Sequence, residues 1–139
     1  LACAMLVAGA VFPLRLAQPD GPRTEAAANA FSEAALAQAR ASGKPVFLYF
    51  TADWCLSCKV NEAGAIDRAE VQKAFDKAGV RTLVGDWTGG DPTITRFLES
   101  HGRSGVPLYL WYPAGGGAAR ELPQVLTPSL LIGLAEKAG

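Results

Sequence analysis

The chain has 139 residues, half of them hydrophobic and 19% charged, which suits one folded domain and excludes an intrinsically disordered chain. Lysine plus arginine and aspartate plus glutamate number 13 each, so the formal net charge is zero and there is no basic field to hold nucleic acid. Three cysteines are too few, and odd in number, for a small secreted protein held together by disulfides.

The first segment, residues 1–17, is almost wholly apolar or small as far as Phe12. A run of this length is too short to cross a bilayer, which takes about 20 apolar residues. We interpret it as the end of a truncated transmembrane helix or a signal remnant, with an ordinary N-terminal helix as the alternative. Residues 18–29 begin with a Pro- and Gly-rich stretch that indicates a linker, and residues 30–139 form the predicted folded domain.

The first half of this domain predicts a helix, a strand and two further helices. Ser32 is suited to cap the first helix. Residues 46–51 are continuously apolar, aromatic or β-branched, which is typical of a strand buried on both faces. The next helix is expected to start at the cysteine pair, at Cys55, and to run toward Gly64, and another is expected over residues 67–78.

The second half predicts the order strand, helix, strand, strand, helix. Asp91 followed by a proline is a typical start for the first of these helices, and Thr127 followed by a proline opens the second. The strands are expected at residues 80–87, 107–112 and 119–122. Strands separated by helices favour parallel pairing, and a short turn between the last two favours an antiparallel hairpin. The chain is therefore predicted to be an α/β protein with a mixed sheet and helices on both faces.

Two of the cysteines, Cys55 and Cys58, lie three residues apart where the first strand gives way to a helix. Such a pair can close a small disulfide and reopen it. The thiolate is the attacking species, and a helix N-terminus can lower the pKa of a cysteine from about 8.5 to roughly 3.5–7.5. We therefore predict Cys55 as the nucleophile and Cys58, one turn further into the helix and more buried, as the resolving thiol.

Three other roles are open to a cysteine pair. A zinc site needs about four ligands, and only His101 and Cys3 remain as further His or Cys ligands. A purely structural disulfide over two residues constrains little of the unfolded chain. A soft ion such as Cu(I) binds paired thiolates and stays open as an alternative. The redox interpretation itself needs no metal or organic cofactor.

The segment Thr51-Ala52-Asp53-Trp54-Cys55-Leu56-Ser57-Cys58-Lys59, with Asn61 and Glu62 after it, resembles the active-site motif of the thioredoxin superfamily. More narrowly, it is similar to the C-terminal periplasmic domain of bacterial membrane thiol:disulfide interchange proteins of the DsbD and ScsB type. Gly105-Val106-Pro107 matches that family's proline loop. The resemblance covers roughly residues 30–138 and implies a thioredoxin-like, three-layer α/β fold.

The same resemblance implies a location and partners. In such proteins the domain follows a membrane-embedded electron carrier and faces the periplasm at the inner membrane. The implied activity is protein-disulfide reduction, with electrons received from an upstream thiol pair of the same protein and passed to periplasmic thiol–disulfide proteins. A net oxidant or isomerase of protein disulfides is the alternative. The dipeptide Leu56-Ser57 lacks the histidine that makes such disulfides more oxidising, which favours the reductant.

Three residues are implied as the binding surface around the pair. Pro107 matches the family's cis-proline, which faces the cysteines, although a plain strand-entry proline is an alternative. A cis-proline there would hold Val106 extended beside Cys55, so that the Val106 backbone pairs with the partner's cysteine-bearing segment. Trp54 is expected to shield one side of Cys55, with packing unrelated to redox chemistry as the alternative.

Glu62, one helical turn after Cys58, resembles an acidic residue that the family places near the pair. A buried carboxylate there could exchange protons with the Cys58 thiol, whereas a solvated helix-face charge could not. The sequence departs from the superfamily at Tyr49, where relatives carry an aspartate six residues before the first cysteine. A phenol is a poor base near neutral pH, so proton handling is left to Glu62, Asp53 or water.

Overall fold

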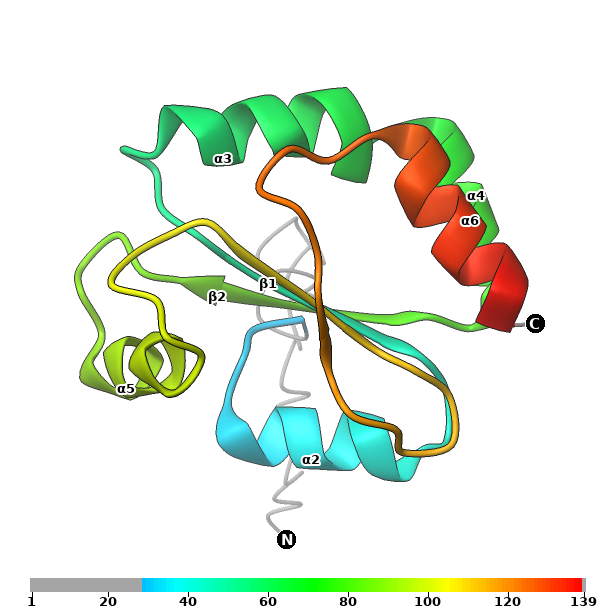
Figure 1. The fold of residues 1–139 in the computed structure, drawn as a ribbon, viewed down its shortest axis with the longest axis horizontal. Helices are drawn as coiled ribbons and strands as arrows, with labels where there is room; N and C mark the ends of the chain where they lie inside the picture. Colours follow the sequence, from blue (N-terminus) through cyan, green and yellow to red (C-terminus); the bar gives the residue numbers. More distant parts are fainter. Residues whose placement is uncertain (1–28, 139) are drawn as a thin grey trace, which may run out of the picture.

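The computed structural model describes residues 29–138, which form a four-stranded mixed sheet with helices on both faces (Figure 1). The predicted apolar segment and all but the last residue of the predicted linker lie outside the described residues. The strands are ordered β2 (Arg81–Asp86), β1 (Val46–Thr51), β3 (Leu108–Tyr112) and β4 (Arg120–Glu121). β1 pairs parallel with β2 and antiparallel with β3, and β3 pairs antiparallel with β4, which confirms the predicted mixed sheet.

The helices form two layers (Figure 1). One layer contains α3 (Leu56–Asn61), the π-helical segment η1 (Glu62–Ile66), α4 (Ala69–Ala78) and α6 (Pro128–Ala138). The other contains α2 (Glu33–Ala41) and α5 (Pro92–Ser100). In the part of the chain that the structure describes, no helix has the length and apolar character needed to cross a membrane.

The two large hydrophobic clusters of the core lie one on each face of the sheet, and a third, small cluster contains the cysteine pair. All six residues of β1 are buried, as their apolar character predicts. Phe47 and Tyr49 face the α4 and α6 layer, whereas Val46, Leu48 and Phe50 face the α2 and α5 layer. This alternation follows from the two-residue period of a strand. The central strand is thereby fixed from both sides, and the segment that carries the cysteine pair leaves its C-terminal end.

The predicted helix starts are formed by side-chain caps. Ser32 Oγ accepts a hydrogen bond from the Ala35 N–H at 2.9 Å. Asp91 Oδ1 accepts the Ile94 N–H at 3.1 Å, with a proline in the first turn. Thr127 Oγ1 accepts a backbone N–H of the last helix in the same way. Each cap satisfies one of the N–H groups that a helix start leaves without an intrahelical partner.

The helix after the cysteine pair differs from the predicted one. It is α-helical only to Asn61 and continues as the π-helix η1, in which the Asp67 N–H donates to the Glu62 carbonyl at 2.8 Å. This five-residue spacing is the hydrogen-bond pattern of a π-helix. The predicted helix over residues 67–78 accordingly begins two residues later, at Ala69. Glu62 is the first residue of this π segment.

Candidate active site

Cys55 and Cys58 are joined by a disulfide, with their Cα atoms 5.3 Å apart. Cys55 is the N-cap of α3, and its Sγ accepts the Cys58 N–H at 3.3 Å. Cys55 is 7% exposed and Cys58 is 1% exposed, so Cys58 is the more deeply buried of the two. The partial positive charge at a helix start and the aligned N–H both favour a thiolate at Cys55 in the reduced form.

The proline loop packs against the disulfide. The Val106–Pro107 peptide bond is cis, as the resemblance implies. Val106 is half-buried and packs on Ala52, Cys55 and Cys58. The loop preceding β3 therefore contacts the cysteine pair.

The loop before the cysteines is tied to the loop after β2 through Thr88. Thr88 Oγ1 accepts the Asp53 N–H at 3.0 Å and donates to Asp86 Oδ1. The Thr88 carbonyl accepts the Trp54 indole N–H at 3.2 Å. The Trp54 ring lies 6.0 Å from the ring of Trp87 and is 61% exposed. These contacts place Trp54 on Trp87 and on this loop, and no sequence signal points to Thr88 across a separation of 34 residues.

Four large hydrophobic side chains are exposed among residues 29–138, and three of them belong to or adjoin α3. Leu56 is 80% exposed and Val60 and Trp54 are each 61% exposed. The fourth, Val125, is 73% exposed and lies beside α3 because its neighbours in the chain both bond to Asn61. Trp54 and Leu56, which flank Cys55 in the chain, thus border the disulfide with exposed apolar side chains of the kind that other proteins contact.

The carboxylate of Glu62 is largely withdrawn from solvent. Its side chain is 17% exposed, and its Oε2 accepts the Thr51 hydroxyl at 3.1 Å. Lys59 Nζ lies 3.4 Å from Oε1 and 3.9 Å from an oxygen of Asp53. The Glu62 N–H donates to the Cys58 carbonyl, so Glu62 follows Cys58 by one helical turn. This is a hydrogen-bonded carboxylate rather than a freely solvated one, and its role in proton exchange stays a prediction.

Tyr49 lies on β1, six residues before Cys55, where the resemblance led us to expect an aspartate. It is 7% exposed and packs with Phe47 and Tyr109. Burial raises the pKa of the Tyr49 phenol well above its ordinary value, and the nearby charge of Glu62 raises this pKa further. The phenol therefore keeps its proton at neutral pH.

Asn61 is a buried polar residue that ties α3 to the segment after β4. It is 5% exposed, and its amide donates to the Tyr109 hydroxyl at 2.9 Å and to the Gln124 carbonyl at 2.8 Å. Its Oδ1 accepts the Leu126 N–H at 3.1 Å. A buried amide with partners for both of its ends is stable in an apolar environment. Sequence reasoning did not assign this role to Asn61, because all three partners are 48 to 65 residues away.

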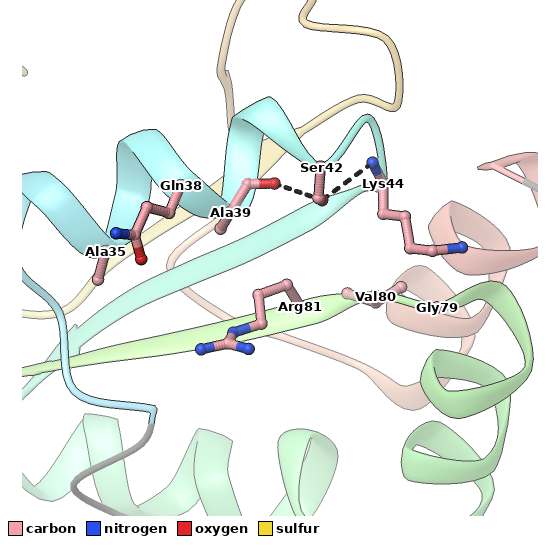
Figure 2. Close-up of a pocket in the computed structure, with 8 residues that line it drawn as sticks. All are labelled: Ala35, Gln38, Ala39, Ser42, Lys44, Gly79, Val80 and Arg81. Atoms are coloured by element: carbon pink, nitrogen blue, oxygen red, sulfur yellow. Dashed lines mark hydrogen bonds between the residues drawn. The ribbon is translucent and has the colours of Figure 1, made fainter.

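A separate pocket of about 370 Å³ lies at the other end of the sheet, between the end of α2 and the start of β2 (Figure 2). Arg81, which lines it, pairs with Val46 at the beginning of β1, whereas the cysteines follow the end of that strand. In Figure 2, Ser42 lies between the carbonyl of Ala39 and the backbone nitrogen of Lys44. The pocket contains none of the predicted site residues.

His101, considered above as a metal ligand, instead forms the C-cap of α5. Within residues 29–138, His, Cys, Asp and Glu side chains form no group of three that could hold a metal ion.

A family model described as thioredoxin-like matches residues 27–114. Among curated proteins, the thiol:disulfide interchange protein DsbD 1 of Pseudomonas aeruginosa is 37% identical over 105 residues, which is 76% of this chain and 17% of that protein. DsbD of Cronobacter sakazakii is 36% identical over 80 residues, which is 58% of this chain and 14% of that protein. The chain thus spans less than a fifth of the length of these curated relatives.

Comparison with solved structures also finds similarity to DsbD. The C-terminal domain of Neisseria meningitidis DsbD in its reduced form superposes with a TM-score of 0.61 at 28% identity, covering 79% of this chain and 99% of that domain. The oxidised form of the same domain gives a TM-score of 0.59 at 28% identity, covering 84% of this chain and 94% of that chain. The expected fold class is therefore confirmed.

Proposed function

Because the chain belongs to the thioredoxin-like family, we propose that it reduces disulfides of partner proteins through reversible oxidation of Cys55 and Cys58. The observation that carries this proposal is the position of Cys55 Sγ at the start of α3, where it accepts a backbone N–H and is bonded to the more buried Cys58. The curated relatives are named thiol:disulfide interchange proteins, which supports the same chemistry.

The reduced form acts in two steps. The Cys55 thiolate attacks one sulfur of the partner's disulfide, so that a mixed disulfide forms and the partner's other sulfur leaves as a thiolate. Cys58 then gives up its proton and attacks Cys55 Sγ, which closes the Cys55–Cys58 disulfide and releases the partner's second thiolate. Two electrons pass to the partner, whose two thiolates take up protons equivalent to those lost by the cysteine pair.

The partner docks at the proline loop and the apolar border of the disulfide. Val106, which packs on both cysteines, is placed to pair its backbone with an extended partner segment. Pro107 follows Val106 in the same loop, and the exposed ring of Trp54 adds apolar contact area. With a formal net charge of zero, the chain relies on shape and local contacts more than on electrostatic steering.

The chain receives its electrons from a membrane-embedded thiol pair of the same longer protein and works at the periplasmic face of the inner membrane. This part of the proposal is supported by the similarity to DsbD C-terminal domains and by the small share of DsbD that the chain covers. Its partners are periplasmic thiol–disulfide proteins.

The two cysteine roles are tested by trapping. Cys58→Ser is expected to accumulate a mixed disulfide with a disulfide-bonded model peptide, because the resolving sulfur is missing. Cys55→Ser is expected to trap nothing, although it has the same number of thiols. Non-reducing electrophoresis and mass spectrometry report the adduct, and Cys3→Ser in both variants removes the third thiol. Trapping by Cys55→Ser alone would reverse the assigned roles, and trapping by neither would reject the function.

The direction of electron flow is tested by the reduction potential. Equilibration with glutathione buffers is expected to give a potential below about −200 mV, on the reducing side of the oxidant DsbA. A value well above that figure would favour the oxidant or isomerase instead. Stoichiometric Cu(I) binding with negligible reductase activity would favour a copper-binding module.

A further inference from the structure

Thr51, the last residue of β1, makes a contact that the two-cysteine chemistry does not require. Its side chain is buried, and its hydroxyl donates a 3.1 Å hydrogen bond to Glu62 Oε2, 11 residues further along the chain. This bond joins the end of the central strand to the first residue of the π-helix. It therefore ties the Glu62 carboxylate to the end of the fully buried central strand.

The second contact of the carboxylate is looser. Lys59 Nζ is 3.4 Å from Glu62 Oε1, but its side chain is 43% exposed and also lies 3.9 Å from Asp53. A half-exposed lysine has many rotamers and its charge is screened by water. Threonine is β-branched, and a buried threonine is restricted to few rotamers. Of the two groups that touch the carboxylate, Thr51 is the one that determines its position.

Cys58 and Glu62 lie on successive turns of one helix, four residues apart. Side chains with this spacing share a helix face and are neighbours. The phenol of Tyr49, on the same strand as Thr51, stays protonated, so it offers no base to Cys58. Glu62 is accordingly the carboxylate on the Cys58 face of the helix that is held in a fixed orientation.

We propose that Thr51 is a positioning residue that holds Glu62 as the proton acceptor for Cys58 when the mixed disulfide is resolved, an inference that rests on the proposed function. In this step the proton of the Cys58 thiol passes to the Glu62 carboxylate and the sulfur electron pair forms the bond to Cys55 Sγ. The bond between Cys55 and the partner sulfur breaks, and the partner leaves as a thiolate. The proton then passes from Glu62 to solvent, which restores the carboxylate.

Stopped-flow reaction of the reduced full chain with Ellman's reagent separates the two steps. Attack by Cys55 releases a first equivalent of thionitrobenzoate, and attack by Cys58 on the mixed disulfide releases a second. All variants carry Cys3→Ser, so that only the pair reacts. The set is the parent, Thr51→Val, Thr51→Ser, Glu62→Gln and the double variant Thr51→Val with Glu62→Gln. Thr82→Val, a half-buried threonine replacement on β2, is the matched control.

The second release should slow by about 100-fold in Glu62→Gln at neutral pH, the low end of what a general base contributes. Thr51→Val, which keeps the shape but removes the donor, should slow it by about tenfold, and Thr51→Ser should stay within about twofold of the parent. These differences should vanish at high pH, where solvent ionises Cys58 without help. In the Glu62→Gln background, Thr51→Val should change nothing further, because Thr51 acts only through the carboxylate.

Three outcomes would overturn the inference. One is a parent-like second release in Thr51→Val, and another is an equal loss in Thr51→Ser or Thr82→Val, which would mean that the hydroxyl is not the cause. The third is a full additional loss from Thr51→Val in the Glu62→Gln background. If the parent itself never releases the second equivalent, the proposed function fails and this inference falls with it.

Discussion

The carbonyl oxygen of Pro107 accepts a hydrogen bond from the Gln124 side-chain amide at 3.1 Å. Arg103 Nη2 donates to the same oxygen at 3.2 Å, and Nη1 of the same guanidinium lies 3.9 Å from Glu121 Oε1. The proline loop is therefore held by donors from the segments on either side of the β3–β4 hairpin. Because Val106 of this loop packs on the disulfide, the two donors fix the surface on which a partner is proposed to dock.

Gln124→Ala is expected to weaken docking more than chemistry. Losing one neutral hydrogen bond costs about 1 kcal/mol, and the freed loop must be ordered again when a partner binds. We expect KM for a disulfide-bonded model peptide to rise by about fivefold while kcat changes by less than about twofold. Gln38→Ala, an exposed glutamine on α2, is the control. An unchanged KM in Gln124→Ala would show that the proline loop does not depend on this bond.

Asn61→Leu is expected to destabilise the domain strongly. The change leaves the Gln124 carbonyl, the Leu126 N–H and the Tyr109 hydroxyl without their present partner. Each buried group left unsatisfied costs about 1–3 kcal/mol, so we expect the free energy of unfolding in urea to fall by about 3 kcal/mol. Ser129→Ala, on the exposed side of α6, should change it by less than about 0.5 kcal/mol. A loss of similar size in both variants would contradict the assigned role.

Asp86 provides a pH-dependent contribution to stability. The hydroxyl of Thr88 and then its N–H donate to the carboxylate and lower the pKa of Asp86. A lowered pKa in the folded state means that the contribution is complete above the unfolded pKa of about 3.9 and is lost as pH falls through the folded value. Asp86→Asn, which keeps an acceptor oxygen, should therefore be less stable than the parent at neutral pH and equally stable in strong acid. Urea unfolding at several pH values measures the difference, which solvation of this largely exposed carboxylate keeps small. A difference that does not vary with pH would contradict this account.

Tyr49→Phe is expected to leave the pH dependence of disulfide resolution unchanged. Burial raises the pKa of the phenol, so the hydroxyl keeps its proton near neutral pH and does not act as a base. The rate of the second thionitrobenzoate release should stay within about twofold of the parent between about pH 6 and pH 9, because the general base lies elsewhere. A shifted pH profile in Tyr49→Phe would mean that the phenol handles the proton after all.

Most of the fold follows from local patterns in the sequence. The strand β1 can be predicted from its run of six apolar, aromatic or β-branched residues, because a strand covered on both faces needs no polar position. The helix starts at Ser32 and Asp91 can be predicted because a capping side chain bonds an N–H only three residues away. The site at the cysteine pair can also be predicted from local sequence, because the strand, the helix start and both thiols lie within 13 consecutive residues. The observed bounds of β2, β3, β4 and α4 differ from the predicted ones by one or two residues.

The sequence by itself determined the redox-active pair, the order of the elements and the mixed sheet, because these depend on spacings of two to four residues along the chain. Only the tertiary structure decided that Glu62 meets the Thr51 hydroxyl, that Thr88 holds Trp54, and that Asn61 and Gln124 tie α3 and the proline loop to the segment after β4. Those contacts join residues 11 to 65 positions apart, and they exist because the packed layers bring distant polar groups together away from water. The π-helix at Glu62 belongs with them, because its five-residue hydrogen bond has no marker in the local sequence.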